Sequence, residues 1–347
     1  IQAFSTLWKI LGGYFRDARL RQLFGRYATY CGSSPFAAPG PLMLVADAEQ
    51  QGVWLARDGM TALPLAIAEL ARKEGARFVF EETVERIVIA NGRAAAVRTA
   101  GGREFAADTI LFNGDPAALS AGLLGEDAIG ATPPRPASER SLSALTLSIA
   151  ASARGFPLQR HNVFFSGDYR AEFDAIFTHG RLPADPTIYV CAQDRDDRGR
   201  RLRPGGAEGL FMIVNAPATG DGMTPTEREV EQCTKLIMQR LSRAGLELEI
   251  DPGAMAATSP QAFHQLFPGT GGALYGRSSH GWMASFQRPT SRSRIPGLYL
   301  AGGATHPGPG LPMAALSGRH AARTILQDCI STARFPKAAM PGGMSMR

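Results

Sequence analysis

The chain has 347 residues, which is enough for one large domain or two intertwined domains with a sizeable core. Its 44% of hydrophobic and 20% of charged residues are typical of a globular protein and exclude a disordered chain of low hydrophobicity. The formal net charge is +6, but the arginines are scattered and acidic residues interleave with them, as in 194–198. We therefore predict a solvated basic surface and no nucleic-acid partner.

The cysteines and histidines of this sequence are widely dispersed. The four cysteines form no Cys-x-x-Cys pair, and the six histidines do not have the spacing of metal ligands. This spacing predicts neither a disulfide framework nor a metal site, and it makes a reducing cytoplasm the default location. No apolar run approaches the roughly 18 residues that cross a bilayer. Because the chain begins with Ile1 rather than Met, we expect it to be a fragment of a longer protein.

Two helices are expected in the first part of the chain. Residues 1–30 form an amphipathic pattern in which apolar residues such as Leu7 and Leu11 recur at helical spacing. We interpret 1–50 as a helical lid or as a membrane-facing segment. A second helix is predicted over 61–74, where its plainest role is to pack on a sheet.

A β-meander is predicted after the second helix. The dipeptide Asn91-Gly92 is a strong hairpin signal, because both central residues of a type I′ turn need a positive φ. A second turn is expected at Gly101-Gly102, and the last strand of the meander is expected to be buried. The β-prone runs span 78–80, 83–89, 94–99 and 109–112.

Two further units follow the meander. Short strands and one helix predict a second, sheet-based domain between about 140 and 265. An α/β pattern then returns, with a strand at 298–301, a Gly/Pro-rich loop and a helix from 312 to 328. The strands of the sheet-based domain are expected at 145–149, 162–165, 187–190 and 210–215, and its helix at 226–244.

The segment 302–313 carries the clearest signal for ligand binding. Glycines without a Cβ let a flat or anionic ligand touch the backbone. Pro312 suits the first turn of a helix, where its missing N–H costs nothing. The start of that helix presents free N–H groups, which suit a phosphate or the negative charge of a reduced flavin. The alternative is that the segment is only a tight turn between a strand and a helix.

The same segment resembles the closing motif of the bacterial-type carotenoid (phytoene) desaturases. The resemblance covers 298–310 and 312–319, and it is greatest to the branch of hydroxyneurosporene and methoxyneurosporene dehydrogenases, the 1-hydroxycarotenoid 3,4-desaturases. It runs through most of the chain. Further blocks with this similarity lie at 26–30, 113–116, 161–166, 271–276 and 279–286.

This resemblance implies an α/β flavoprotein of the amine oxidase and phytoene desaturase type, with a Rossmann-like FAD-binding domain and an α+β substrate domain. It implies FAD as cofactor, a hydrophobic carotenoid as substrate and 3,4-desaturation of a 1-hydroxy or 1-methoxy carotenoid as the reaction. The electron acceptor stays open. The implied parts are a lid or membrane-facing segment at 1–50, FAD-binding parts at 51–118 and 266–330, a substrate domain at 119–265 and a tail at 331–347.

Other functions remain open at this stage. One alternative is phytoene desaturation, and another is a flavin amine oxidase, against which the sequence Thr305-His306-Pro307-Gly308 argues. A third alternative, of another class, is a non-catalytic module that binds lipid or a partner. A carotenoid is lipid-soluble, so we expect a cytoplasmic protein that is peripherally associated with the inner face of the membrane.

Individual residues are assigned through the resemblance. Val84 matches a position whose backbone reads the adenine, although it also suits a core. His306 is a candidate catalytic base, but a histidine that braces the loop beside the flavin is the favoured interpretation, because a polyene cation needs no strong base. His280, Trp282 and Phe286 are candidates for lining a polyene tunnel, with core packing as the alternative. The expected cofactor contacts are Val84, Gly302, Gly303, Thr305, His306, Gly308, Gly310, Pro312 and Met313.

One part of the family pattern has no match in this sequence. The family begins with a Gly-x-Gly-x-x-Gly turn between a strand and a helix, which cradles the FAD pyrophosphate. No such unit precedes residue 50, and the glycines of 269–272 do not follow a convincing buried strand. We therefore expect the chain alone to hold FAD weakly or not at all, and to expose an apolar seam.

Overall fold

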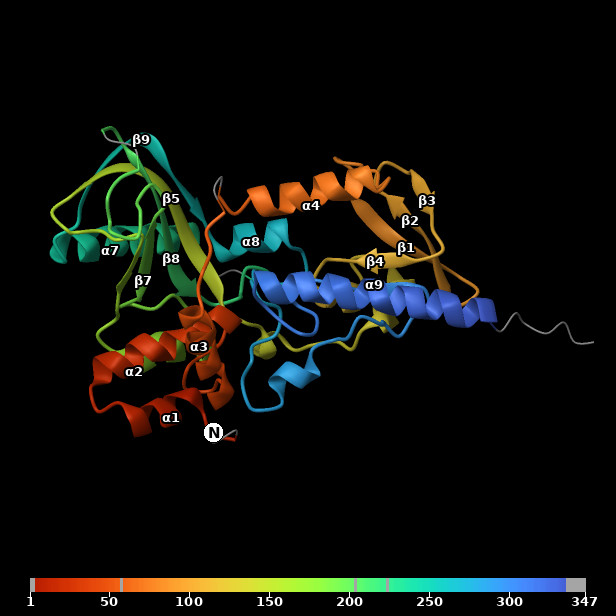
Figure 1. Cartoon of the computed structure of the whole chain (residues 1–347), viewed down its shortest axis with the longest axis horizontal. Coiled ribbons are helices and arrows are strands. Elements are labelled where there is room, and N and C mark those ends of the chain that lie inside the picture. The colour runs from red at the N-terminus through yellow and green to blue at the C-terminus, as the bar shows by residue number, and fades with distance from the viewer. Residues whose placement is uncertain (1–3, 57–58, 203–204, 223–224, 335–347) are drawn as a thin grey trace, which may run out of the picture.

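The computed structural model describes residues 4–56, 59–202, 205–222 and 225–334. Two lobes lie side by side (Figure 1). One lobe contains a five-stranded sheet with α7 (Glu227–Arg243) against it, and the other contains two small sheets between the long helices α4 (Ala62–Lys73) and α9 (Leu311–Arg334). The helices α1 to α3 lie below the five-stranded sheet in this view.

The five-stranded sheet is antiparallel and has the strand order β6-β7-β8-β5-β9. Buried and half-buried residues alternate along the whole of β8, as expected of a strand with one face on a core. All four strands predicted in this region are present, and β9 is an addition. The strands are β5 (Ser143–Arg154), β6 (His161–Phe164), β7 (Ile188–Ala192), β8 (Glu208–Ala216) and β9 (Glu247–Thr258).

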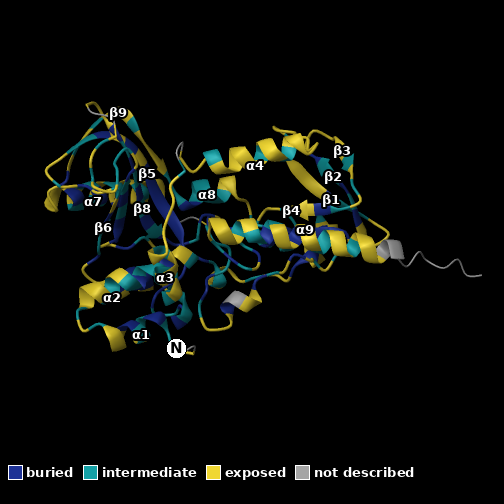
Figure 2. Ribbon diagram, in the orientation of Figure 1, coloured by how far each residue is buried: buried dark blue, intermediate teal, exposed yellow. Residues whose placement is uncertain are grey.

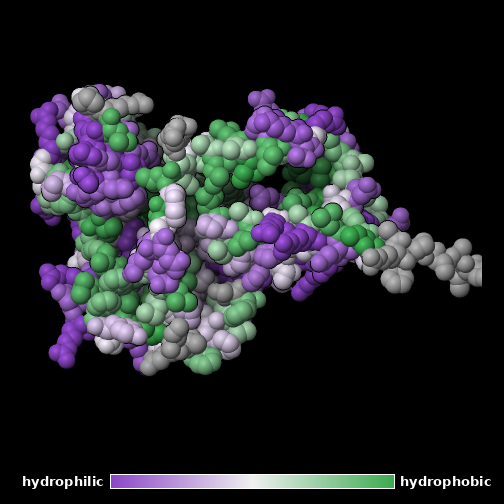
Figure 3. Space-filling model, in the orientation of Figure 1, coloured by the Kyte–Doolittle hydropathy of each residue, from purple (hydrophilic) through white to green (hydrophobic). Residues whose placement is uncertain are grey.

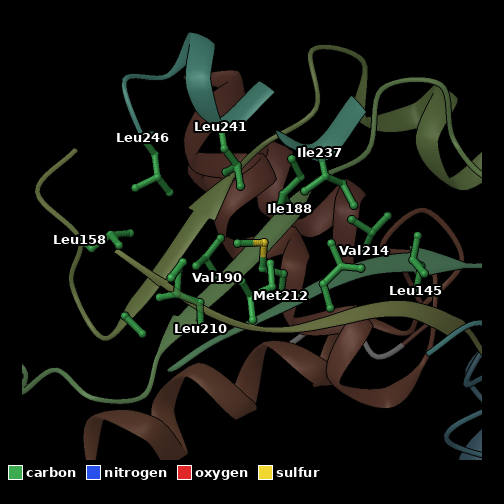
Figure 4. Close-up of a cluster of buried hydrophobic side chains, with 14 of the residues drawn as sticks. Leu145, Leu158, Ile188, Val190, Leu210, Met212, Val214, Ile237, Leu241 and Leu246 are labelled. Carbon is green, nitrogen blue, oxygen red and sulfur yellow. The ribbon is translucent and has the colours of Figure 1, made fainter. Parts of the chain in front are cut away.

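The core of this lobe forms between the sheet and α7. Figure 4 shows Ile237 and Leu241 of α7 pointing toward Ile188, Val190 and Met212 of the strands. All five side chains are fully buried. The helix begins with a capping box, in which Thr226 and Glu229 satisfy each other's backbone N–H groups. Two shorter helices complete the lobe, α6 (Tyr169–Phe177) and α8 (Pro260–Leu266).

The other lobe contains the predicted meander. The hairpin turn is confirmed, since Asn91 has a φ of 52° and Gly92 a φ of 73°. The hairpin and a third short strand form one sheet of order β1-β2-β3. Its strands are β1 (Val84–Ala90), β2 (Arg93–Thr99) and β3 (Glu104–Ala106).

A parallel pair of strands joins two distant segments of the chain. β4 (Ile110–Phe112) pairs with β10 (Leu298–Leu300), residue for residue from Ile110 to Phe112. The strands share a buried cluster with Ile87 of β1 and Leu119 of the short helix α5 (Pro116–Ser120). The meander and the closing strand–loop–helix unit are therefore neighbours, as the sequence predicts for two parts of one cofactor domain.

Three local predictions are wrong, and one of them is the burial of the last strand of the meander, since Leu111 of β4 is exposed. The predicted helix over 1–30 is divided into α1 (Leu7–Tyr14) and α2 (Ala18–Gly25), because Phe15 is extended and Asp17 caps a new helix start. Residues 78–80 form no strand, and their side chains remain exposed with no strand beside them. The chain between α2 and α4 continues through the helix α3 (Leu44–Gln50).

The apolar face of α1 is part of the protein interior. Leu7 and Leu11 are buried against Ala28 and Ala38. Trp8 packs on Phe36 at 4.6 Å between ring centroids. This face therefore does not face solvent, and the role of 1–50 as a lid or as a membrane-facing segment stays a prediction. Within the described parts of the chain, no helix combines the length and hydrophobicity needed to cross a bilayer.

Candidate functional site

The Gly-rich loop 302–310 lies at the carboxyl ends of the parallel strands β4 and β10 and leads into α9. This is the edge at which α/β sheets bind their ligands. Hydrogen bonds fix the loop to both neighbours. The side chain of Asn113, just after β4, donates to the carbonyl of Ala301 at 3.1 Å, and the N–H of Gly302 donates to Ser317 Oγ of α9 at 2.7 Å.

Different structural constraints favour glycine at the different positions of the loop. Gly302, Gly308 and Gly310 have φ values of 123°, 135° and 102°, which other residues rarely adopt. At Gly303 an added Cβ would meet only Pro309 Cα, at 4.0 Å, so the backbone is open there. The buried Thr305 closes the turn by donating its hydroxyl to the carbonyl of Gly302 at 2.7 Å. The open backbone beside a helix start fits a flavin or its phosphates.

Arg288 supports the loop from within the protein, and no motif in the sequence marks this residue. Its guanidinium is buried and donates to the carbonyls of Tyr275 at 2.9 Å, Arg277 at 2.6 Å and Gly303 at 3.4 Å. A Cβ on Gly308 would approach its Nε to 3.3 Å. The φ of Gly308 and the close approach of Arg288 both favour a glycine at 308, whereas the cofactor contact expected there stays a prediction.

The remaining expected cofactor residues line the start of α9. The N–H of His306 donates to the carbonyl of Pro289 at 2.8 Å, while its exposed imidazole has no hydrogen-bonding partner among the described residues. Pro312 occupies the first turn of α9, as predicted, and Met313 beside it is exposed. The roles of these residues as a base, a brace or a cofactor contact stay predictions.

Val84 begins β1 in the same lobe and is partly exposed, so it is not a core residue. Near it, α4 buries none of its residues, as its exposed colouring in Figure 2 makes plain. Hydrophobic side chains gather in a hollow between α4 and α9 (Figure 3). The apolar surface expected from the sequence is therefore present. Its exposed members include Leu63, Leu65, Ile67, Leu70, Phe80 and Leu111.

His280 is the innermost of the three expected substrate residues. Its Nε2 accepts the N–H of Ser34 at 3.0 Å, and its ring packs edge-on against Phe177 at 4.6 Å. Burial lowers its pKa from 6.5 to about 4, so the ring is neutral near pH 7. Phe177 in turn lines a cavity of about 530 Å³ on the five-stranded sheet side.

The wall of this cavity includes an ion pair. Arg140 bonds to Asp221 through two contacts of 2.8 and 2.6 Å. Arg140 also lines a second cavity of about 170 Å³, which reaches Asp115 and Gly276 beside the Gly-rich loop. No local pattern in the sequence marks Arg140 or Asp221, because the two residues meet across 81 positions.

Trp282 and Phe286 lie on the surface. Their exposed fractions are 54% and 72%, and Trp282 packs edge-on against the exposed Phe4 at 5.3 Å. The backbone of Gly281 is fixed to the interior through Ala37 at 2.9 Å. Tunnel lining by Trp282 and Phe286 stays a prediction, and in this structure they can face a tunnel only at its mouth.

Comparison with known proteins identifies the class. Residues 37–326 match the family described as flavin containing amine oxidoreductase, and the chain belongs to this family. A solved oxidoreductase from Methanosarcina mazei has the same fold, with a TM-score of 0.59 at 14% identity over 93% of this chain and 68% of that one. The α/β flavoprotein fold and the flavin cofactor expected from the sequence are confirmed at the level of the family.

Among curated proteins the similarity is to carotenoid desaturases. A hydroxyneurosporene desaturase of Rubrivivax gelatinosus is 49% identical over 100% of this chain and 66% of its own length. A 1-hydroxycarotenoid 3,4-desaturase of a Flavobacterium species is 34% identical over 90% of this chain and 63% of its own length. The resemblance stated from the sequence is confirmed. The chain spans less than two thirds of the length of these relatives.

The loop glycines give a matched pair of variants. Gly308→Ala and Gly310→Ala both place a Cβ at a positive φ, but only the first meets another group, Arg288, within 4 Å. We expect Gly308→Ala to bind FAD at least about tenfold more weakly than Gly310→Ala, since displacement of the guanidinium disturbs the carbonyls that it holds. Titration of full-length gene product with FAD, followed by flavin fluorescence, measures this. Equal affinities would show that Arg288 does not constrain position 308.

His280 makes folding stability depend on pH. Its pKa is lower in the folded protein than in the unfolded chain, so the unfolded state gains a proton first as the pH falls. We expect its contribution to be complete above about pH 6.5 and to decline toward pH 4 by roughly 3 kcal/mol. The free energy of unfolding is measured in urea across this pH range for the wild type and for His280→Gln, whose amide oxygen still accepts from Ser34. The difference between the two pH dependences gives the contribution of the His280 imidazole. An identical pH dependence in both proteins would contradict the assignment.

Proposed function

We propose that the protein is an FAD-dependent desaturase that oxidises a C–C bond of a carotenoid. The strongest support is the 49% identity over the whole chain to a hydroxyneurosporene desaturase. The open backbone at Gly303, at the carboxyl ends of β4 and β10, gives a flavin a place to lie. When bound, FAD supplies the oxidant that accepts two electrons.

The residues of this chain hold and shield the reacting parts. Asn113, Ser317 and Arg288 fix the loop backbone, so the ligand surface is preorganised before the cofactor arrives. The cavity beside Phe177 gives apolar surface for part of a polyene. The backbone N–H of His306 fixes the position of this residue, and its imidazole is exposed. We assign no residue as the acceptor of the proton that the substrate loses.

The finer substrate assignment is 3,4-desaturation of a 1-hydroxy or 1-methoxy carotenoid. It is supported by the names of two relatives, a hydroxyneurosporene desaturase and a 1-hydroxycarotenoid 3,4-desaturase. The polar atoms of Arg140 and Asp221 in the wall of the larger cavity suit an oxygen-bearing end group.

Carotenoids with different end groups test the assignment. The full-length protein with FAD is incubated with a 1-hydroxy carotenoid, a 1-methoxy carotenoid, phytoene or putrescine. We expect a red shift of polyene absorption with the oxygenated carotenoids, because each new double bond extends the conjugation. Oxidation of phytoene alone would favour phytoene desaturation, and oxidation of the amine alone would favour an amine oxidase. Carotenoid binding without any product would favour the non-catalytic module.

We also propose that the protein docks on the inner face of the cytoplasmic membrane through an aromatic patch formed by Phe4, Trp282 and Phe286. Aromatic side chains of this kind settle at the boundary between water and lipid. The patch is firmly attached, since Phe4 packs on Trp282 and Gly281 is fixed to Ala37. The substrate supports the proposal, because a carotenoid is dissolved in the bilayer.

The patch is tested with lipid vesicles. We expect the double variant Trp282→Ser/Phe286→Ser to lose at least about tenfold in affinity for vesicles that contain anionic lipid, since two large apolar side chains leave the interface. Trp54→Ser is the matched control, because Trp54 is an exposed tryptophan outside the patch. Co-sedimentation measures binding. Equal loss in the control would show that no particular patch carries the attachment.

A further inference from the structure

Arg288 is a buried cation without a carboxylate partner. Its side chain is only 3% exposed, and all three of its hydrogen bonds go to backbone carbonyls. Among the residues that the structure describes, it forms no ion pair, whereas Arg277 nearby pairs with Glu139 at 3.3 Å. Burial lowers its pKa to about 10, so the group is still charged near pH 7. A full positive charge thus lies in the protein interior.

This charge lies directly behind the Gly-rich loop. One guanidinium nitrogen bonds to the carbonyl of Gly303, and another lies 3.3 Å from the place of a Cβ on Gly308. A ligand on the open side of Gly303 is therefore separated from the charge by one segment of backbone. Because the guanidinium is buried, its charge is screened much less than that of an arginine on the surface.

The charges around Arg288 leave an excess of positive charge, because Arg135 and Arg277 lie near it as well and face only the carboxylates of Asp115 and Glu139. The Asp115 carboxylate accepts the N–H of Ala117 at 2.8 Å as the cap of α5, and burial raises its pKa. Arg135 has no hydrogen bond or ion pair within the described ranges and adds positive charge on the same side. The polar environment behind the loop is therefore biased toward positive charge, which favours a ligand that becomes negative.

We infer that Arg288 sets the reduction potential of the bound flavin by stabilising its reduced, anionic form, and so makes the protein a stronger oxidant. Charge near the flavin ring is one of the means by which a protein adjusts this cofactor. The role is one of positioning and electrostatics, because Arg288 acts through the loop backbone. The inference rests on one part of the proposed function, which is that a flavin binds at the Gly-rich loop.

Two variants of Arg288 separate charge from hydrogen bonding. Arg288→Gln removes the charge but keeps an amide that donates to carbonyls, and Arg288→Lys keeps the charge with fewer donors. We expect Arg288→Gln to lower the equilibrium constant for flavin reduction about tenfold, a shift of about 30 mV for a two-electron couple. Arg288→Lys is expected to change it less than about threefold and to bind FAD more weakly. Equilibration with reference dyes measures the potential, independently of any carotenoid.

Arg292→Gln is the control for net charge, because Arg292 lies on the surface and pairs with Asp328 at 2.7 Å. Its potential should match the wild type, and an equal shift in this control would overturn the inference. An unchanged potential in Arg288→Gln, with flavin bound, would overturn it and leave the proposed function intact. Should Arg288→Gln hold no flavin, the inference requires Arg288→Lys to keep both flavin and potential. All of these proteins are full-length, and absence of flavin from the full-length wild type would overturn the proposed function as well.

Discussion

The parallel pairing of β4 with β10 is the constraint on which the candidate site depends. These strands have only three residues each, yet they bring together two segments nearly 190 positions apart. Their carboxyl ends carry Asn113 on one side and the Gly-rich loop on the other. Without this register, Asn113 would not reach the carbonyl of Ala301, and the loop would lose its fixed point next to the sheet.

The loop is then held by satisfying its polar groups rather than by packing. Glycine offers no side chain to bury, so the free carbonyls and N–H groups of the loop would be costly inside the protein if they were left without partners. Ser317, Thr305 and Arg288 supply those partners from three directions. The consequence is a backbone that is rigid where it meets the protein and open where a ligand approaches Gly303.

Local signals in the sequence predict much of the fold and little of this bracing. Asn91-Gly92 specifies its turn by itself, and β7 and β8 of the large sheet alternate as a half-buried strand should. The sequence does not predict β9, an edge strand that contains Pro252, which has no N–H to donate to a neighbour. The structure accommodates it in an irregularity, where β9 has more residues than β5 between the pairs with Ile149 and Ala151.

The strand expected at 78–80 does not form, although local propensity favours it. Its residues have a high β propensity, but a strand also needs a neighbour to pair with, and the described residues offer none there. Arg288 illustrates the same limit for the site. Its three acceptors lie 11 to 15 residues away in sequence and meet only after β10 has paired with β4. Hydrogen bonds from a guanidinium to backbone carbonyls do not depend on the side chains of the acceptor residues, so no sequence motif marks them.

The join between the two lobes explains why a site can form at all. Gly276, in the segment after the sheet domain, approaches Ala304 so closely that an added Cβ would lie 2.7 Å from its Cβ. Gly269 is equally close to the backbone of Ala118. These contacts between glycines and small residues bring the segment after the sheet domain against the Gly-rich loop and against α5. Arg288 donates hydrogen bonds to carbonyls in 275–277 and to the carbonyl of Gly303, and these bonds hold the two segments together. The same buried cation therefore joins the two segments and places a positive charge between them.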